Sequence, residues 1–341
     1  MAPGSAGPEP SASSQTVRDT EPPELSVIVP VFNERDSLRP FFEKLIAVLD
    51  SLPHTSEALF IDDGSLDGSG ELLREFEASD RRVRVLEFVR NFGQTAAIAA
   101  GFEHARGDII ITMDADLQND PEDLPRILSK LEEGYDVVSC WRRKRRDPWL
   151  TRVLPSRLAN SLVSRISGVR LHDFGCTLKG YRREVVSHIR LYGEMHRFIP
   201  IFAAWAGARV AEIEVRHHPR MAGKSKYGLL RTFKVLLDLI TIKFLGSYST
   251  KPMYLFGGLG FLSFCAGGVL ALAALYQRFF EAVRAHRNPL LLLSVFFLLV
   301  GLQFILFGLI AELIVRTYHE SQGKPTYLLK QARRNETQGT R

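Results

Sequence analysis

The chain has 341 residues, of which 45% are hydrophobic, and a formal net charge of +6 at pH 7. This length allows one sizeable domain with an accessory region. The three cysteines, Cys140, Cys176 and Cys265, are too widely spaced for a disulfide framework or a zinc site, so we expect inert reduced thiols. A basic chain first suggests nucleic acid as a partner. Here the positive excess lies beside two long apolar segments, so we expect anionic lipid of a bilayer as the partner, and no nucleic acid.

Strands and helices alternate through the first part of the chain. Strands are predicted over residues 25–31, 57–61, 83–88, 109–113 and 135–140, and helices over residues 36–50, 67–78, 93–105 and 121–133. Four strand-to-helix alternations predict an α/β domain, Rossmann-like, with a mostly parallel sheet and helices on both faces. We place this domain at residues 25–226. The Pro, Ser, Gly and Ala-rich residues 1–24 are expected to form a disordered tail.

Polar clusters follow three of these strands: Asn33 with Glu34, Asp62 with Asp63, and Asp114 with Asp116. In open parallel sheets, ligands bind beyond the carboxyl ends of the strands. Alternation along an extended strand end would put the last two carboxylates on one side.

Two carboxylates this close repel each other and suit Mg²⁺ or Mn²⁺, which also bind substrate phosphates. Asp-x-Asp alone is most often a solvated turn with an acidic cap. Three acidic clusters on one rim favour a metal site. Neither a dinucleotide-binding motif nor a P-loop is present, so a nucleotide held by a metal and by carboxylates fits better.

A dense basic run at residues 141–149 (WRRKRRDPW) precedes an amphipathic helix predicted over residues 151–167, with Arg152, Arg157 and Arg165 among apolar residues. A solvated charged face or a nucleic-acid patch are the ordinary interpretations. Beside membrane segments we favour contact with lipid headgroups or an anionic lipid substrate, since arginine suits phosphate.

The next segment contains a turn entering a strand at residues 172–183, a helix at 197–206 and a strand at 208–215. Residues 216–227 are polar with a glycine, as expected of a lid closing over a diphosphate. The pair His217-His218 lacks a partner at metal spacing and is taken as structural. Residues 227–252 have apolar positions at helical spacing and predict an amphipathic juxtamembrane helix on the bilayer surface, with a core-packing helix as the alternative.

Two uncharged apolar runs, residues 253–276 and 290–311, each reach the roughly 20 residues that a membrane helix needs. They predict a transmembrane hairpin within residues 253–315. Close helix approach is expected from the glycines of the first run: Gly257, Gly258, Gly260, Gly267 and Gly268. The first 25 residues contain no apolar core of a secretion signal, and Lys and Arg are more frequent outside the hairpin than in its loop. We therefore expect the main domain and residues 316–341 in the cytosol.

Several motifs together resemble a known family. They are residues 26–34 (SVIVPVFNE), 62–68 (DDGSLDG), 91–94 (NFGQ), 113–118 (MDADLQ), 120–122 (DPE), 173–182 (DFGCTLKGYR) and 220–227 (RMAGKSKY). Their order and spacing resemble the inverting GT-A glycosyltransferases, and among them the polyprenyl-phosphate glycosyltransferases, which include dolichol-phosphate mannose synthase and the bactoprenol glucosyltransferases. The resemblance runs from about residue 25 to the second apolar run.

The resemblance implies a role for each matching residue. The nucleotide would be held by Pro30, Asn33, Glu34, Asp62, Asp63, Gln94 and Asp114. The metal and the diphosphate would lie among Asp114, Asp116 and Gln118. The acceptor phosphate would contact Arg142, Arg152 and Ser156. The mobile loop closing on the donor would contribute Arg220 and Lys224. Asp116 would be catalytic, as would Asp173, which matches a carboxylate proposed as a base or a sugar ligand.

The resemblance implies a membrane-bound enzyme that moves one sugar from a nucleotide diphosphate sugar to a polyprenyl phosphate with Mg²⁺ or Mn²⁺. A UDP-hexose such as UDP-glucose, undecaprenyl phosphate, a multi-pass location in the inner (plasma) membrane and a homo-oligomer are expected. A phosphate monoester is largely ionised because its second pKa is near 6, so for Asp173 an orienting role is expected first and the role of a base second. The processive Gln-x-x-Arg-Trp motif is absent, which indicates a single transfer. Three alternatives stay open: a GDP-mannose-dependent dolichol-phosphate type of enzyme, a membrane-anchored glycosyltransferase with a non-lipid acceptor, and a non-enzymatic scaffold.

Overall fold

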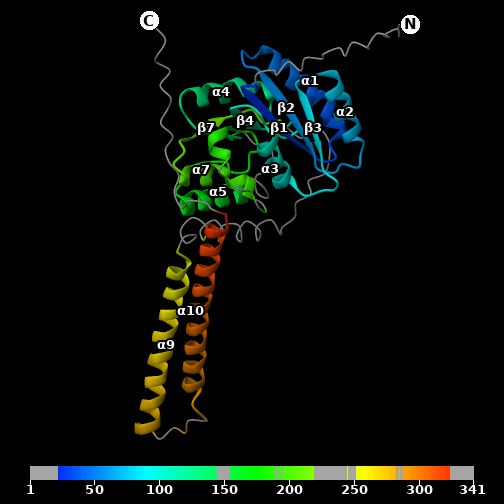
Figure 1. The fold of residues 1–341 in the computed structure, drawn as a ribbon. Coiled ribbons are helices and arrows are strands. Elements are labelled where there is room, and N and C mark those ends of the chain that lie inside the picture. Colours follow the sequence, from blue (N-terminus) through cyan, green and yellow to red (C-terminus); the bar gives the residue numbers. More distant parts are fainter. Residues whose placement is uncertain are drawn as a thin grey trace, which may run out of the picture.

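The computed structural model describes residues 22–143, 154–187, 189, 191, 193, 195–218, 244, 251–281, 284 and 287–322. An α/β domain is followed by a long helical hairpin that extends away from it (Figure 1). Arg152, Arg220 and Lys224 lie outside the described residues. So do most of the predicted tail and juxtamembrane helix, and residues 323–341.

The described part of the α/β domain contains a seven-stranded sheet in the order β3-β2-β1-β4-β6-β5-β7. The strands are β1 (Leu25–Val31), β2 (Ser56–Asp62), β3 (Val83–Glu87), β4 (Ile109–Thr112), β5 (Val137–Trp141), β6 (Lys179–Arg182) and β7 (Val210–Glu214). β6 runs antiparallel to both β4 and β5, whereas the other strand pairs are parallel. The predicted mostly parallel sheet is confirmed. The insertion of β6 between β4 and β5 was not predicted.

Helices cover both faces of the sheet, as the sequence predicted. One face packs against α1 (Arg35–Ser51), α2 (Ser69–Ser79) and α4 (Leu124–Glu132), which follows the short helix η1 (Pro121–Asp123). The other face packs against α3 (Gln94–His104), α6 (Arg183–Val186) and α7 (Ile199–Trp205), which follows η3 (Met195–Phe198). A third apolar cluster joins α5 (Leu154–Ser167) to α7.

The position of α3 matters for the site because its N-terminus faces the ends of the central strands. Gly101 lies on α3 against β1, and a Cβ there would stand 2.4 Å from Cγ2 of Ile28. Because α3 has no side chain at this point, it packs close to the sheet. Its first turn therefore lies beside the carboxyl ends of β1 and β4.

The hairpin consists of α9 (Pro252–Phe280) and α10 (Pro289–Gln322), which lie side by side (Figure 1). Both are long and apolar enough to cross a membrane, and both extend beyond the predicted apolar runs. A Cβ on Gly260 would stand 2.9 Å from the carbonyl oxygen of Gly301, and one on Gly267 would stand 2.9 Å from Cγ of Leu298. The expected close approach is thus confirmed at these two glycines, whereas Gly258 and Gly268 have no neighbouring atom within 4 Å.

Candidate active site at the carboxyl edge of the sheet

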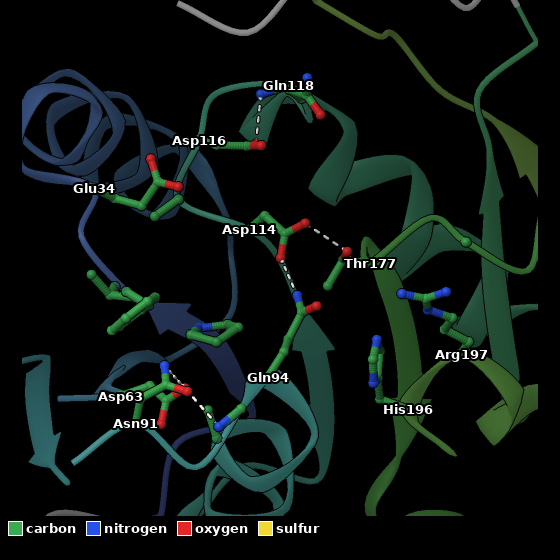
Figure 2. A pocket seen from close by; sticks show the side chains of 17 residues that line it. Glu34, Asp63, Asn91, Gln94, Asp114, Asp116, Gln118, Thr177, His196 and Arg197 are labelled. Atoms are coloured by element: carbon green, nitrogen blue, oxygen red, sulfur yellow. Dashed lines mark hydrogen bonds between the residues drawn. The ribbon is translucent and has the colours of Figure 1, made fainter. Parts of the chain in front are cut away.

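A cavity of about 350 Å³ lies at the carboxyl ends of β1, β2 and β4 and at the N-terminus of α3 (Figure 2). This volume falls in the range of small-molecule sites. Seven of the predicted site residues line it: Pro30, Glu34, Asp63, Gln94, Asp114, Asp116 and Gln118. The rim that the sequence predicted from three acidic clusters therefore encloses a cavity.

Asp63 shapes one end of the cavity. Its carboxylate accepts hydrogen bonds from the side chain of Asn91 (2.9 Å) and from the backbone N–H groups of Phe92 (2.7 Å) and Gly93 (2.9 Å). Burial raises the pKa of Asp63, and the adjacent carboxylate of Asp62 adds to the shift, although the two backbone donors oppose it. Asp63 thus holds the loop that enters α3 against the end of β2.

Asn33 and Asp62 do not line the cavity. Asn33 has a positive φ of 56°, and its side-chain oxygen accepts a hydrogen bond from the backbone N–H of Leu66 (2.9 Å). Asp62 accepts one from the N–H of Ser65 (2.9 Å), whose hydroxyl in turn accepts from the N–H of Asn33 (3.0 Å). These bonds tie the turn after β1 to the turn after β2. Nucleotide contacts from Asn33 and Asp62 stay a prediction.

Asp114 and Asp116 stand at the centre of the cavity. The oxygens of Asp114 accept hydrogen bonds from Nε2 of Gln94 (2.7 Å) and from the hydroxyl of Thr177 (2.6 Å), and Asp116 accepts one from the backbone N–H of Gln118 (3.1 Å). Burial first, and then the negative charge of Asp116, raise the pKa of Asp114 to about 6. Two carboxylates this close, one of which raises the pKa of the other, suit a shared cation.

The reason that both carboxylates reach the cavity differs from the predicted one. β4 ends at Thr112, so strand alternation does not extend to Asp116. Instead the chain turns after the strand, with Leu117 at a φ of 58°. A positive φ is unusual for a leucine and marks a tightly constrained turn.

The donor set of this centre fits a divalent ion. Each carboxylate oxygen has two lone pairs, so Asp114 keeps acceptor capacity beside its two hydrogen bonds. Among the described residues no group of three His, Cys, Asp or Glu side chains is placed to hold a metal. Magnesium is usually held by one or two carboxylates, with waters and substrate phosphates completing its shell. The two aspartates match that pattern.

The segment after Gln118 is tied to the residues that follow β7. Asp120 pairs with Lys44 (2.8 Å) and with Nε2 of His218 (3.1 Å), and the backbone N–H of His218 donates to the carbonyl oxygen of Gln118 (3.0 Å). Although burial alone would raise it, the pKa of Asp120 is lowered because Lys44, the N–H of Glu122 and His218 donate to it. These contacts agree with the prediction that the pair His217-His218 has a structural role.

Arg142 and Asp173 form a nearly buried ion pair. Nε and Nη2 of Arg142 donate to the two carboxylate oxygens at 2.8 and 3.1 Å, and the side chains are 13% and 4% exposed. Burial alone would lower the pKa of Arg142, but the carboxylate of Asp173 outweighs it and raises that pKa.

Gly175 separates this pair from the cavity. It belongs to the cavity wall, and a Cβ there would stand 3.4 Å from Nη2 of Arg142 and 3.5 Å from Oδ1 of Asp173. The pair therefore lies directly behind the wall. Ser156, the third predicted acceptor contact, lies at the start of α5.

The structure adds four polar side chains to the lining that were not predicted as site residues: Asn91, Thr177, His196 and Arg197 (Figure 2). Nδ1 of His196 lies 2.6 Å from the hydroxyl of Thr95, in the first turn of α3. Burial, with the charge of the adjacent Arg197, lowers the pKa of His196 to about 3, so the ring is neutral. Asn91 belongs to the quoted NFGQ motif, whereas no motif or spacing marked His196 or Arg197.

A mostly parallel sheet with an Asp-x-Asp pair in a cavity at its carboxyl edge defines the class of GT-A glycosyltransferases. The fold agrees with the glucosyl-3-phosphoglycerate synthase of Mycobacterium tuberculosis, with a TM-score of 0.51 and 18% sequence identity over 64% of this chain and 80% of that chain.

The sequence shows the particular family. Residues 26–190 match the model of Glycosyl transferase family 2. The dodecaprenyl-phosphate galacturonate synthase of Rhizobium johnstonii is 42% identical over 93% of this chain and 96% of its own length. The undecaprenyl-phosphate 4-deoxy-4-formamido-L-arabinose transferase of Shewanella sediminis is 39% identical over 90% of this chain and 91% of its own length. The chain belongs to glycosyl transferase family 2 and, within it, to the polyprenyl-phosphate glycosyltransferases, which confirms the resemblance and the GT-A fold.

Proposed function

We propose that this protein transfers one sugar from a UDP-hexose, such as UDP-glucose, to a polyprenyl phosphate, with undecaprenyl phosphate as the acceptor. One observation carries the proposal: the acidic centre at Asp114 and Asp116 lines the cavity, and the Arg142–Asp173 pair lies directly behind the cavity wall at Gly175. The first suits a metal-bound diphosphate, and the second suits the phosphate of an acceptor. Two relatives named above act, by their names, on dodecaprenyl phosphate and undecaprenyl phosphate.

The donor and metal assignments follow from the cavity. The nucleoside would lie at the end formed by Pro30, Glu34 and Asp63, and Mg²⁺ or Mn²⁺ would be held by Asp114, Asp116 and Gln118. The M. tuberculosis synthase of the same fold was crystallised with Mn²⁺ and UDP, at a TM-score of 0.50. When bound, the metal ion supplies a positive charge that offsets the negative charge on the departing UDP.

The protein's own residues position the two reactants. An oxygen of the lipid phosphate forms the new bond to the anomeric carbon while the bond to the UDP oxygen breaks, which inverts that carbon and leaves the electron pair on UDP. The N–H groups of Arg142 that do not donate to Asp173 would orient the lipid phosphate. Asp173 is the positioning residue that holds Arg142, because both of its oxygens accept from that guanidinium. The lipid phosphate is already ionised near neutral pH, so no strong base is needed.

The surface of α5 supports a site beside a bilayer. Leu158 and Leu162 on this helix are 65% and 43% exposed, and Arg157 and Arg165 are exposed as well. α5 lies at the end of the α/β domain from which the hairpin extends (Figure 1). Apolar and basic residues on one helix suit the headgroup region of an anionic membrane. We place the hairpin in the inner membrane and the α/β domain on its cytosolic side.

The test is a transfer assay with purified full-length protein, undecaprenyl phosphate and a panel of labelled UDP-hexoses and GDP-mannose. Label should enter the organic phase from a UDP-hexose only with Mg²⁺ or Mn²⁺ present. Asp116→Asn should abolish transfer and keep binding to vesicles containing the lipid, whereas Asp36→Asn on the exposed start of α1 should change neither.

Three results would contradict parts of the proposal. Transfer that persists with chelator, or in Asp116→Asn, would remove the metal centre. Label from GDP-mannose alone would replace the donor. Transfer without any lipid phosphate would replace the acceptor.

A further inference from the structure

Gln303 is a polar residue near the middle of α10, and it faces away from the other helix of the hairpin. The side of α10 that contacts α9 contains Gly301 and Ile305. A Cβ on Gly260 of α9 would stand 2.9 Å from the carbonyl oxygen of Gly301 and 2.8 Å from Cγ1 of Ile305. Gln303 is two positions from each of these residues, and two positions turn an α-helix by about 200°. Its side chain is accordingly exposed.

A bilayer offers this exposed amide no hydrogen-bond partner. The apolar window of α10 is Pro289–Val315, so Gln303 lies next to its centre. From Gln303 to Val315 the helix rises about 18 Å, which is farther than a glutamine side chain reaches toward water. Within the described part of the chain, the side chain of Gln303 makes no hydrogen bond. An unpaired amide in hydrocarbon is costly, so a partner from outside the hairpin is expected.

The exposed side of α10 around Gln303 has the spacing of a helix–helix seam. Phe296, Leu299, Leu306 and Ile310 are 57%, 56%, 49% and 53% exposed. Together with Gln303 they follow one another at alternating spacings of three and four residues, the positions whose side chains meet in a coiled coil. Apolar residues occupy every side of a membrane helix, so the amide is what singles out this side. We call these five residues the α10 seam.

A second copy of this chain is the partner that fits the amide. Two copies in one membrane have the same orientation, so each carries Gln303 at the same depth. An amide side chain both donates and accepts, and two of them can therefore satisfy each other across a symmetry axis. A lipid tail, including that of a polyprenyl phosphate, is hydrocarbon at this depth and offers neither a donor nor an acceptor.

We propose that copies of this protein associate through the α10 seam, with the Gln303 side chains hydrogen-bonded to each other between copies. Hydrogen bonds between side chains such as glutamine stabilise helix association in membranes, and one polar residue in an apolar seam fixes its register. The inference rests on the proposed placement of the hairpin in the membrane and is independent of the sugar and of the acceptor. It specifies the surface through which a homo-oligomer forms.

The first experiment measures self-association of the full-length protein in vesicles of phosphatidylethanolamine and phosphatidylglycerol. Energy transfer between copies labelled with two fluorophores is followed as the protein is diluted with lipid. Gln303→Leu should need about 10-fold more protein per lipid for half-association than the wild type, because it removes the hydrogen bond between copies. Gln303→Asn keeps an amide and should regain part of this loss.

Leu262→Ala is the matched control for this measurement. Leu262 is 67% exposed and lies two positions beyond Gly260, so it is at a similar depth to Gln303 and faces away from α10. Truncating it should leave the association unchanged.

The second experiment locates the contact by cross-linking. Cys265 on α9 is exposed, so the measurement uses a Cys265→Ser background, in which the other two cysteines are buried. On oxidation with copper phenanthroline in vesicles, Leu299→Cys should form a disulfide between copies, and Leu262→Cys should not.

Each outcome decides for or against the seam. Wild-type protein that stays monomeric at every dilution, or Gln303→Leu protein that associates as the wild type does, would overturn the inference. Cross-linking through Leu262→Cys and not through Leu299→Cys would place the contact on another face and overturn it as well. Association through the seam without sugar transfer would support the inference and refute only the proposed function, whereas transfer by a monomer would do the reverse.

Discussion

Replacing Asp173 with asparagine tests whether this carboxylate positions Arg142 or acts as the base. The change turns one oxygen into an NH₂ group and removes the negative charge. In the native pair the oxygens accept from Nε of Arg142 at 2.8 Å and from Nη2 at 3.1 Å, and Oδ1 also accepts from the N–H of Gly175 at 3.0 Å. In the asparagine variant, the NH₂ group therefore either faces the N–H donors of the guanidinium or turns away, and in both cases Arg142 keeps only one of its two acceptors.

The cost to stability follows from burial. Removing one partner of a buried ion pair costs about 3–5 kcal/mol, because the other charge is left without compensation. Arg142 is 13% exposed and retains some solvent, so we expect about 3 kcal/mol, at the lower end of that range. Asp173→Glu keeps the charge and should regain part of this loss. Replacing both partners, as Arg142→Met with Asp173→Asn, should cost less than the sum of the two single changes.

The assay combines denaturant unfolding of the purified protein with steady-state kinetics for both substrates. A positioning role predicts that Asp173→Asn raises KM for undecaprenyl phosphate and leaves KM for the UDP-sugar unchanged. A general base contributes typically 10²–10⁴-fold to the rate. A loss of kcat of that size, with stability and lipid KM both unchanged, would refute the reasoning from the ion pair.

Three further predictions follow from other parts of the structure. Gly175→Val places a branched side chain between the cavity and Arg142, so turnover with undecaprenyl phosphate should fall while UDP binding, measured by titration, stays unchanged; weakened UDP binding would contradict this. The pKa of His196 is lowered to about 3 from an ordinary 6.5, so between these pH values the unfolded chain binds a proton that the folded chain does not bind. Stability is therefore lost as pH falls below about 6.5, by about 1.4 kcal/mol at pH 5.5, and His196→Asn should lack this part of the pH dependence in unfolding experiments; equal slopes for both proteins would argue against it. Gly260→Val would push a side chain against the carbonyl oxygen of Gly301 and should destabilise the hairpin by about 1–3 kcal/mol in detergent, whereas Gly268→Val, with no atom within 4 Å, should be neutral; similar effects from both would exclude this packing.

Local patterns in the sequence were sufficient for the order of elements and for the acidic rim. The alternation of apolar strand runs with amphipathic helices predicted the mostly parallel sheet, because each pattern reports which face of a segment is buried. The clusters at Glu34, Asp63 and Asp114 were predicted to converge, since parallel strands bring their carboxyl ends to one edge. Two uncharged apolar runs predicted the hairpin, and two of the five glycines of the first run, Gly260 and Gly267, lie where its helices approach.

Only the tertiary structure placed the second half of the site. β6 enters the sheet antiparallel between β4 and β5, which brings Thr177 within 2.6 Å of Asp114 and Gly175 to the cavity wall. His196 reaches Thr95 at 2.6 Å, and Arg142 reaches Asp173, across 101 and 31 residues of sequence. Periodicity and spacing describe burial within one segment, whereas contacts like these depend on how distant segments pair and pack. For that reason the sequence indicated a metal and a nucleotide, and only the fold brought Thr177, His196 and Arg197 to the cavity.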